Sequence, residues 1–369
     1  MSRLNVMHIT DTLAVGGAER MAVNLVNLLP RERYSPHLCT TRDEGPLAEL
    51  VAGDVGRLRL TRRQRFDIGA VRQLVGYIRR NRIRVLHAHE NSLFIAVAAS
   101  LFPPRPAVVW HDNYGRCELE ERPAWLYRLA AAGVGGVIAV NQTLVEWSRR
   151  RLGLPEQRVW YVPNCVYEGG PSRPPGDLPG EAGGRIVCVA NLRPQKDHLN
   201  LVRAMAVVAG DFPAAHLLLV GGGTDQTHRR AIEQEIARLG LGGQVTLLGE
   251  RSDVGAILRA CDVGVLSSAS EGLPLSLLEY GMAGLPAVTT RVGQCAEVLD
   301  DGRAGILVPP ARPDLLGQAL ASVLSSREAR ARMAEVLQRR VREVYSPDAV
   351  ILQVCGVYDA VARPAAGAA

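Results

Sequence analysis

The chain has 369 residues, 47% hydrophobic and 22% charged, which is the composition of a globular protein of about two domains. This apolar fraction excludes global disorder, and the scattered glycines and 7 separated cysteines exclude collagen and a disulfide scaffold. The cysteine number is odd and no CxxC pair occurs, which predicts a reducing cytoplasm rather than a zinc or redox motif. We see no signal peptide, and the longest apolar runs are too short to span a bilayer.

The formal net charge of +6 is distributed unevenly along the chain. Residues 1–165 carry 23 arginines and 15 acidic residues, whereas 166–369 carry 20 cationic and 22 acidic residues. The basic clusters at 57–65, 79–84 and 149–151 could attract an anionic membrane surface, or could simply be solvated helix faces. No aromatic residues interleave with them, so nucleic acid is not an expected partner.

The first half alternates short apolar runs, which predict buried strands, with amphipathic stretches that predict helices. The predicted elements are strand Leu4–Ile9, helices Glu19–Leu29 and Val71–Asn81, strands Val85–Ala88, Ala107–Trp110 and Val137–Val140, and a helix at 143–152. This order indicates a parallel sheet that helices cover on both faces.

A segment rich in glycine and proline, 169–184, then predicts a linker, because it can continue neither a helix nor a central strand. Alternation resumes with strands at 185–190, 215–220, 245–248, 263–267 and 287–289, and helices at 198–209, 229–239, 254–259, 274–283, 313–324, 327–344 and 347–362. We therefore predict an α/β protein with an N-terminal domain at 1–168, a C-terminal domain at 185–346, and a closing helix and tail at 347–369. Two such domains facing each other across a cleft would suit transfer between two bound molecules.

The segment Ser267–Glu279 follows an apolar run and carries two carboxylates, Glu271 and Glu279. Pro274 is typical of the first turn of a helix, and Gly272 lets backbone approach a ligand closely. A helix N-terminus binds anions, so an anion cradle flanked by two carboxylates would suit a phosphorylated sugar. A capped helix with two solvated glutamates is the alternative.

Lys196 is the only lysine of the chain and lies in a loop with Arg193, just after a predicted strand. In a chain that otherwise uses arginine, one lysine suggests a site that needs a compact charge, although chance also explains it. Together the two cations could stabilise a diphosphate leaving group.

Three further features are less specific. Gly16-Gly17 follows the first strand and either admits a ligand or makes a tight turn. Gly221-Gly-Gly223 lacks the spacing of a dinucleotide fingerprint. His111 comes directly after a predicted strand, where a catalytic and a structural role are both open. We expect no metal site, because no cluster of ligands is visible.

Taken together, these motifs resemble those of the family 4 glycosyltransferases, and the resemblance covers nearly the whole chain. The resemblance also rests on three further motifs, Val162-Pro-Asn164, Gly284-Leu-Pro286 and Val292-Gly293. The resemblance implies the GT-B fold, with two Rossmann-like domains across a cleft and a last helix that crosses back to the first domain.

The resemblance also implies a retaining transfer of a hexosyl group from a nucleoside diphosphate sugar to a hydroxyl of a glycan or lipid-linked acceptor. A UDP-sugar is favoured over a GDP-sugar, and no metal or other cofactor is implied. The setting would be bacterial surface polysaccharide or glycolipid synthesis, in the cytoplasm or on the inner face of the membrane. A sugar-nucleotide epimerase of the same build and a non-catalytic sugar-nucleotide-binding protein are the alternatives.

Four residues carry over as catalytic. Arg193 and Lys196 would contact the diphosphate, Glu271 would hold the sugar and phosphate, and His111 would lie against the transferred sugar.

The remaining positions carry over as binding residues. The amides of Gly272 and Leu273 would assist Glu271, and Glu279 would bind the ribose hydroxyls. Gly16 and Gly17 would shape a loop near the donor phosphates and the acceptor.

Overall fold

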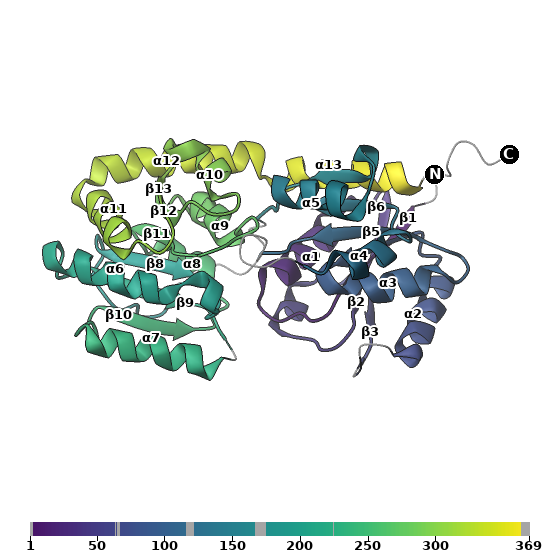
Figure 1. Cartoon of the computed structure of the whole chain (residues 1–369), viewed down its shortest axis with the longest axis horizontal. Coiled ribbons are helices and arrows are strands. Elements are labelled where there is room, and N and C mark those ends of the chain that lie inside the picture. The colour runs from purple at the N-terminus through teal and green to yellow at the C-terminus, as the bar shows by residue number, and fades with distance from the viewer. Residues whose placement is uncertain are drawn as a thin grey trace. The chain divides into compact units, whose positions relative to one another are not determined.

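The computed structural model describes residues 3–62, 64, 67–115, 122–166, 175–223 and 225–362. They divide into two compact units, whose elements are labelled in Figure 1. The first unit comprises the described residues of 1–114, 122–166 and 347–362, and the second comprises 115 and 175–346. The first residues of the predicted linker, 169–174, and the predicted tail, 363–369, lie outside the described residues.

The first unit is built on a parallel sheet of seven strands in the order β3-β2-β1-β4-β5-β6-β7. The strands are β1 (Leu4–Thr10), β2 (Tyr34–Thr40), β3 (Gly56–Arg59), β4 (Val85–His89), β5 (Ala107–Asp112), β6 (Gly136–Ala139) and β7 (Val159–Tyr161). The helices are α1 (Gly17–Leu28), α2 (Ile68–Arg80), α3 (Leu93–Ser100), α4 (Ala124–Ala131), α5 (Gln142–Leu152) and α13 (Pro347–Ala362).

The C-terminal helix α13 belongs to the core of the first unit. Its residues Val350, Val354 and Tyr358 are fully buried in one cluster with Val6 of β1 and Val85 of β4. The predicted return of the last helix to the first domain is therefore confirmed.

The second unit has a parallel sheet of six strands in the order β10-β9-β8-β11-β12-β13. The strands are β8 (Arg185–Val189), β9 (His216–Val220), β10 (Val245–Gly249), β11 (Val263–Leu266), β12 (Ala287–Thr290) and β13 (Ile306–Val308). The helices are α6 (His198–Asp211), α7 (Gln226–Arg238), α8 (Val254–Arg259), α9 (Leu275–Ala283), α10 (Cys295–Val298), α11 (Pro313–Ser325) and α12 (Arg327–Val344).

Strand order reverses direction once in each sheet, between β1 and β4 and between β8 and β11. At such a switch point the connections leave the sheet on opposite sides, so a crevice forms outside the carboxyl ends of the two strands. The loops that follow β8 and β11 carry Lys196 and Glu271 respectively.

The predicted strands and helices are present, with ends that shift by a few residues, but several elements were missed. The strand β2 was not predicted, because Pro36 interrupts its apolar pattern and argues against a strand next to β1. The short strands β3, β7 and β13 span only three or four residues, too few for a periodic pattern.

Two further findings concern helix length and the cysteines. Among the described residues, no helix is both long and apolar enough to cross a bilayer. The six described cysteines are buried and free of disulfides.

Candidate functional site

The loop that follows β8 holds Lys196 and Arg193 on a short 3-10 turn, Pro194–Lys196. The backbone N–H of Lys196 donates to the carbonyl of Arg193 at 2.9 Å. Asp197 then takes a left-handed conformation (φ +46°), and its carboxylate caps α6 by accepting from the N–H of Asn200 at 3.2 Å. This places Lys196 immediately before a capped helix, while the side chain of Arg193 is exposed.

The loop that follows β11 is fastened to the first loop by two hydrogen bonds. The hydroxyl of Ser267 donates to the carbonyl of Lys196 at 2.9 Å, and the N–H of Ala269 donates to the carbonyl of Gln195 at 2.8 Å. Because β8 and β11 are neighbours at the switch point, residues some 70 positions apart in sequence become adjacent.

An ion pair joins Lys196 and Glu271. The Nζ atom of Lys196 lies 2.6 Å from Oε1 and 2.8 Å from Oε2 of Glu271, and the hydroxyl of Ser268 donates to Oε1 at 2.6 Å. The side chains are 18% and 5% exposed respectively, so the pair is largely withdrawn from water. Lys196 and Glu271, which the sequence predicts to be ligand-binding charges, therefore neutralise each other in this ion pair.

Gly293 permits the close packing around Glu271. It has φ +49°, and a Cβ atom there would lie 2.3 Å from the carbonyl oxygen of Glu271 and 2.5 Å from that of Gly272. The neighbouring Gln294 donates its N–H to the carbonyl of Gly272 at 3.0 Å. Gly293 thus brings the loop after β12 against the loop after β11.

Helix α9 begins directly after Gly272-Leu273-Pro274. Pro274 takes the extended cap position rather than the predicted first turn, and the helix starts at Leu275. Gly272 and Leu273 are buried, and Glu279 is half-buried inside the helix. Tyr280 anchors the helix to the sheet: its hydroxyl accepts from the N–H of Val189 at 2.8 Å and donates to the carbonyl of Val265 at 3.2 Å.

The glycine run Gly221–Gly223 has a packing role in the second unit. Gly221 has φ +153°, and a Cβ there would lie 2.1 Å from the carbonyl oxygen of Ala190. The carbonyl of Gly222 accepts from the N–H of Leu192 at 2.7 Å. The run therefore supports the loop that carries Lys196.

In the first unit, Gly16 caps α1 in an extended conformation and Gly17 is the first residue of that helix. The two glycines therefore lie at a helix N-terminus after β1, and the carboxylate of Glu19 lies against Gly16.

His111 lies inside β5, which extends two residues beyond the predicted strand, and its side chain is fully buried. Its Nδ1 atom lies 3.0 Å from Nε2 of His87, and its Nε2 atom has no hydrogen-bond partner among the described residues. Burial lowers the pKa of His111 to about 3, so the ring is neutral at physiological pH.

His111 belongs to a group of four buried histidines. His8 and His87 are register partners on β1 and β4, and His89 and His111 are register partners on β4 and β5. Burial, reinforced by the repulsion of a charge on His111, lowers the pKa of His8 to about 3, and burial also lowers the pKa values of His87 and His89 well below the usual range.

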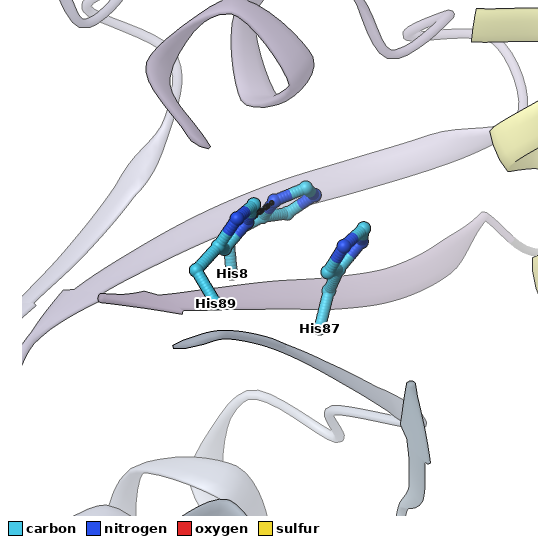
Figure 2. Close-up of side chains that lie close together, drawn as sticks. All are labelled: His8, His87 and His89. Atoms are coloured by element: carbon cyan, nitrogen blue, oxygen red, sulfur yellow. Dashed lines mark hydrogen bonds between the residues drawn. The ribbon is translucent and has the colours of Figure 1, made fainter. Parts of the chain in front are cut away.

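By residue type, His8, His87 and His89 could hold a metal ion. Each offers a ring nitrogen, and these atoms lie within 4.8 Å of one another (Figure 2). The sequence predicts no metal site, and this group of three histidines is therefore a feature that its motifs did not indicate. Its geometry suits a metal poorly, because the rings of His87 and His89 are parallel within 2° and stacked at 4.7 Å. A ring nitrogen binds a metal in the ring plane, and stacked rings direct their lone pairs side by side rather than toward one point.

A second buried ion pair, between Asp112 and Arg122, was also missed. The guanidinium donates to both carboxylate oxygens at 2.9 and 2.6 Å, and the side chains are 1% and 7% exposed. The guanidinium also lies over the ring of Trp147, 4.0 Å from the centroid. The pair braces the end of β5 just after His111, and no local sequence pattern indicates it.

Comparison with known proteins identifies the family. A family model described as "Glycosyltransferase Family 4" matches residues 15–168, and one described as "Glycosyl transferases group 1" matches residues 180–340. The chain belongs to the family 4 glycosyltransferases. The resemblance noted from the motifs is thereby confirmed.

Two curated relatives differ in how much of their length is matched. An exopolysaccharide phosphotransferase of Streptomyces coelicolor is 30% identical over 198 residues, 53% of this chain but 20% of that protein. The UDP-Gal:alpha-D-GlcNAc-diphosphoundecaprenol alpha-1,3-galactosyltransferase of Escherichia coli is 25% identical over 315 residues, 79% of this chain and 80% of that protein.

Solved structures confirm the GT-B fold of this family 4 glycosyltransferase. Anabaena HepE in complex with UDP and glucose superposes with a TM-score of 0.81 at 19% identity, covering 97% of this chain and 100% of that one. The lipopolysaccharide glycosyltransferase WaaG superposes with a TM-score of 0.69 at 15% identity, covering 98% and 100%.

Proposed function

We propose that this chain transfers a hexosyl group, with retention of anomeric configuration, from a nucleoside diphosphate sugar to a hydroxyl of a glycan or lipid-linked acceptor. The bond between the sugar and the diphosphate breaks, a bond from the sugar to the acceptor oxygen forms, and the acceptor hydroxyl loses its proton. We favour a UDP-sugar as the donor.

The observation that carries this proposal is the Lys196–Glu271 pair at the switch point of the second sheet. A diphosphate leaving group gains negative charge as its bond to the sugar breaks, and fixed cations lower the free energy of that transition state. Lys196 is held by two loops and Arg193 is exposed beside it. Glu271 holds the ammonium in place and offers a carboxylate to sugar hydroxyls.

The other residues take the roles that the family implies. The amides of Gly272 and Leu273, just before α9, would bind phosphate oxygens at a helix N-terminus. Glu279, one turn into the helix, would accept hydrogen bonds from the ribose hydroxyls.

In the first unit, Gly16 and Gly17 would admit the donor phosphates and the acceptor at the start of α1. His111 would contact the transferred sugar through Nε2. A buried ring nitrogen without a partner is costly, and a sugar hydroxyl would satisfy it once the side chains that cover His111 move aside.

The relatives support the choice of substrates. The Escherichia coli relative is named for UDP-Gal and for an acceptor linked through diphosphate to undecaprenol. Anabaena HepE has been solved with UDP-glucose. These names favour a UDP-sugar and a lipid-linked acceptor, and hence surface polysaccharide or glycolipid synthesis.

The experiment that tests the proposal is a thermal-shift screen followed by a transfer assay. A ligand that binds only folded protein raises its melting temperature, so we expect a UDP-sugar to raise it more than GDP- or ADP-sugars. The stabilising donor is then incubated with and without polyprenyl-diphosphate glycan, and the anomeric configuration of the product is determined. Formation of an epimer from donor alone, without transfer, would indicate an epimerase instead.

We also propose a position on the inner face of the cytoplasmic membrane, through the basic first unit. Arg80, Arg82 and Arg84, at and just after the end of α2, are exposed. Each cation near an anionic surface contributes about 1 kcal/mol of attraction.

The wild type should float with anionic liposomes at low salt, and the triple Arg→Gln variant of these residues should not. The control is Arg→Gln at three exposed arginines of α12 (332, 339 and 342), which should float as the wild type does; equal flotation of both variants would contradict the proposal.

A further inference from the structure

Four hydrogen bonds connect the buried histidines of the first unit into one line through Tyr358 of α13. His89 Nε2 lies 3.0 Å from His8 Nδ1, and His8 Nε2 lies 3.0 Å from the Tyr358 hydroxyl. That hydroxyl lies 2.6 Å from His87 Nδ1, and His87 Nε2 lies 3.0 Å from His111 Nδ1. The two outer nitrogens, Nδ1 of His89 and Nε2 of His111, have no partner among the described residues. We call this line the histidine–tyrosine chain.

The number of hydrogens restricts the states of this chain. Each neutral imidazole carries one N–H and the phenol carries one O–H, so five groups supply five hydrogens. Each of the four links needs one hydrogen. When the Tyr358 hydroxyl donates to one histidine and accepts from the other, every group donates in the same direction along the line, and the fifth hydrogen is left at one end. Full burial keeps the rings neutral, which is the condition for this count.

Following the atoms through the links leaves two satisfied states. If His89 donates from Nε2 to His8, then His8, His87 and His111 must also carry their hydrogens on Nε2. If the direction is reversed, all four rings carry the hydrogen on Nδ1. One mixed arrangement also fills every link, with the Tyr358 oxygen accepting from both His8 and His87. It leaves the buried Tyr358 O–H without an acceptor and both outer nitrogens without a donor, so it satisfies fewer groups than either uniform state.

We propose that Tyr358 is a positioning residue for His111. Its hydroxyl couples the hydrogen bonds on its two sides, so that the four histidines share one tautomer. The C-terminal helix thereby couples the donor or acceptor state of His111 Nε2 to the tautomers of the other three rings. The part of this inference that concerns transfer rests on the function proposed above; the shared tautomer does not.

Nuclear magnetic resonance of the full chain, labelled with 15N-histidine, tests the shared tautomer directly. Long-range 1H–15N spectra at pH 7.5 distinguish Nδ1–H from Nε2–H rings, and contacts between ring protons assign the four signals. We expect all four rings to show the same tautomer, or the same proportion of the two if the direction of the chain fluctuates. Any mixture of tautomers among the four rings overturns the inference. This experiment uses the wild-type protein and needs no variant.

Tyr358→Phe removes the central hydroxyl and divides the chain into His89–His8 and His87–His111. The 15N signals of His8 Nε2 and His87 Nδ1 should move most, because both atoms lose their partner. Tyr34→Phe is the matched control, because Tyr34 is buried in the same core and packs on Tyr358 with ring centroids 5.9 Å apart, but lies outside the chain. Equal changes in both variants would overturn the inference.

In the transfer assay, Tyr358→Phe should lower kcat about tenfold and change KM for the donor by less than about twofold, since orientation rather than binding is lost. Tyr34→Phe should leave both parameters unchanged. A uniform tautomer with an unchanged kcat would overturn the positioning role alone, whereas absence of transfer by the wild type would count against the proposed function.

A metal ion on the same rings would be a competing use of their lone pairs. The purified protein should therefore hold less than about one zinc per ten chains, and added Zn²⁺ should leave the four histidine signals in place. Stoichiometric zinc, or displacement of those signals by Zn²⁺, would overturn the chain in favour of a metal site.

Discussion

At the scale of single residues, the Lys196–Glu271 pair is the feature on which the proposed donor site depends. Both Glu271 oxygens contact the ammonium, and one of them also accepts from Ser268. Removing one member of a buried pair leaves an uncompensated charge, which is more costly than removing both. The pair is therefore expected to contribute to stability and to donor binding through the same contacts.

We predict that Lys196→Ala lowers kcat/KM by at least about 100-fold, equivalent to about 3 kcal/mol of lost stabilisation of the leaving group. The variant should also melt at a lower temperature, and Lys196→Met combined with Glu271→Gln should recover part of that loss. Steady-state kinetics and thermal unfolding measure both effects.

The matched control is Arg203→Ala, which removes an exposed cation of the same unit; its partner Glu235 keeps Arg238 as a second cation. It should change kcat/KM by less than about twofold, because surface pairs contribute little. Comparable activity losses in the two variants would argue that Lys196 has no special role.

At the scale of elements, the site is a junction of three loops that follow the neighbouring strands β8, β11 and β12. Hydrogen bonds join the first loop to the second, and Thr290 of β12 donates its hydroxyl to the carbonyl of Ser268 at 2.7 Å. The third loop can approach only because Gly293 has no side chain. The position of the Glu271 carboxylate therefore depends on the close approach of Gly293 to the backbone carbonyl groups of Glu271 and Gly272, which are uncharged.

We predict that Gly293→Ala destabilises the second unit and weakens donor binding together. The left-handed conformation costs a non-glycine residue about 1–2 kcal/mol, and the Cβ would also meet the carbonyl oxygens of Glu271 and Gly272. Urea unfolding and donor titration measure the two effects.

The control is Gly240→Ala, which separates backbone strain from steric overlap. Gly240 has φ +70°, but no atom lies within 4 Å of the Cβ that the substitution adds. It should cost only the conformational part and leave donor affinity unchanged. If the two variants behave alike, the close contact at Gly293 is not what shapes the loop.

At the scale of the whole molecule, the two units differ in their response to acid. The first unit buries four neutral histidines, with the pKa values of His8 and His111 lowered to about 3. In the second unit, His198 is buried, and burial lowers its pKa to about 4. All four tryptophans (110, 125, 147 and 160) lie in the first unit, so their fluorescence reports on that unit alone.

We predict that the first unit loses stability as the pH falls from 7.5 to 5.5. The unfolded histidines take up protons below a pKa of about 6.5 while the folded ones remain neutral, so the unfolded state binds more protons and stability decreases with falling pH. Four such residues lose on the order of 5 kcal/mol over this interval.

The urea midpoint followed by tryptophan fluorescence checks this prediction. It should fall between pH 7.5 and 5.5 by much more than it changes between pH 7.5 and 8.0, where no histidine titrates and the cysteines of the unfolded chain are still mostly protonated. A midpoint that is the same at pH 5.5 and 7.5 would mean that the buried rings are protonated in the folded protein.

Most of the longer strands and helices, and the motifs around Lys196 and Glu271, could be recognised in the sequence because they are local patterns. His87 and His89 also carried a usable local signal: residues two apart in a strand point to the same face. That signal was not used, and it could not identify the partners of the two rings.

Periodicity and short motifs were enough to predict two α/β sheets and the family, since neither requires knowledge of spatial neighbours. The contacts of each polar group became known only once the elements were packed together. Strand order placed Lys196 against Glu271, and β1, β4 and β5 side by side brought the histidines together. The packing of α13 against the first sheet placed Tyr358 next to His87, although the two residues are 271 positions apart in the chain. Such contacts follow from the packing of whole elements, and chain separation carries no information about them.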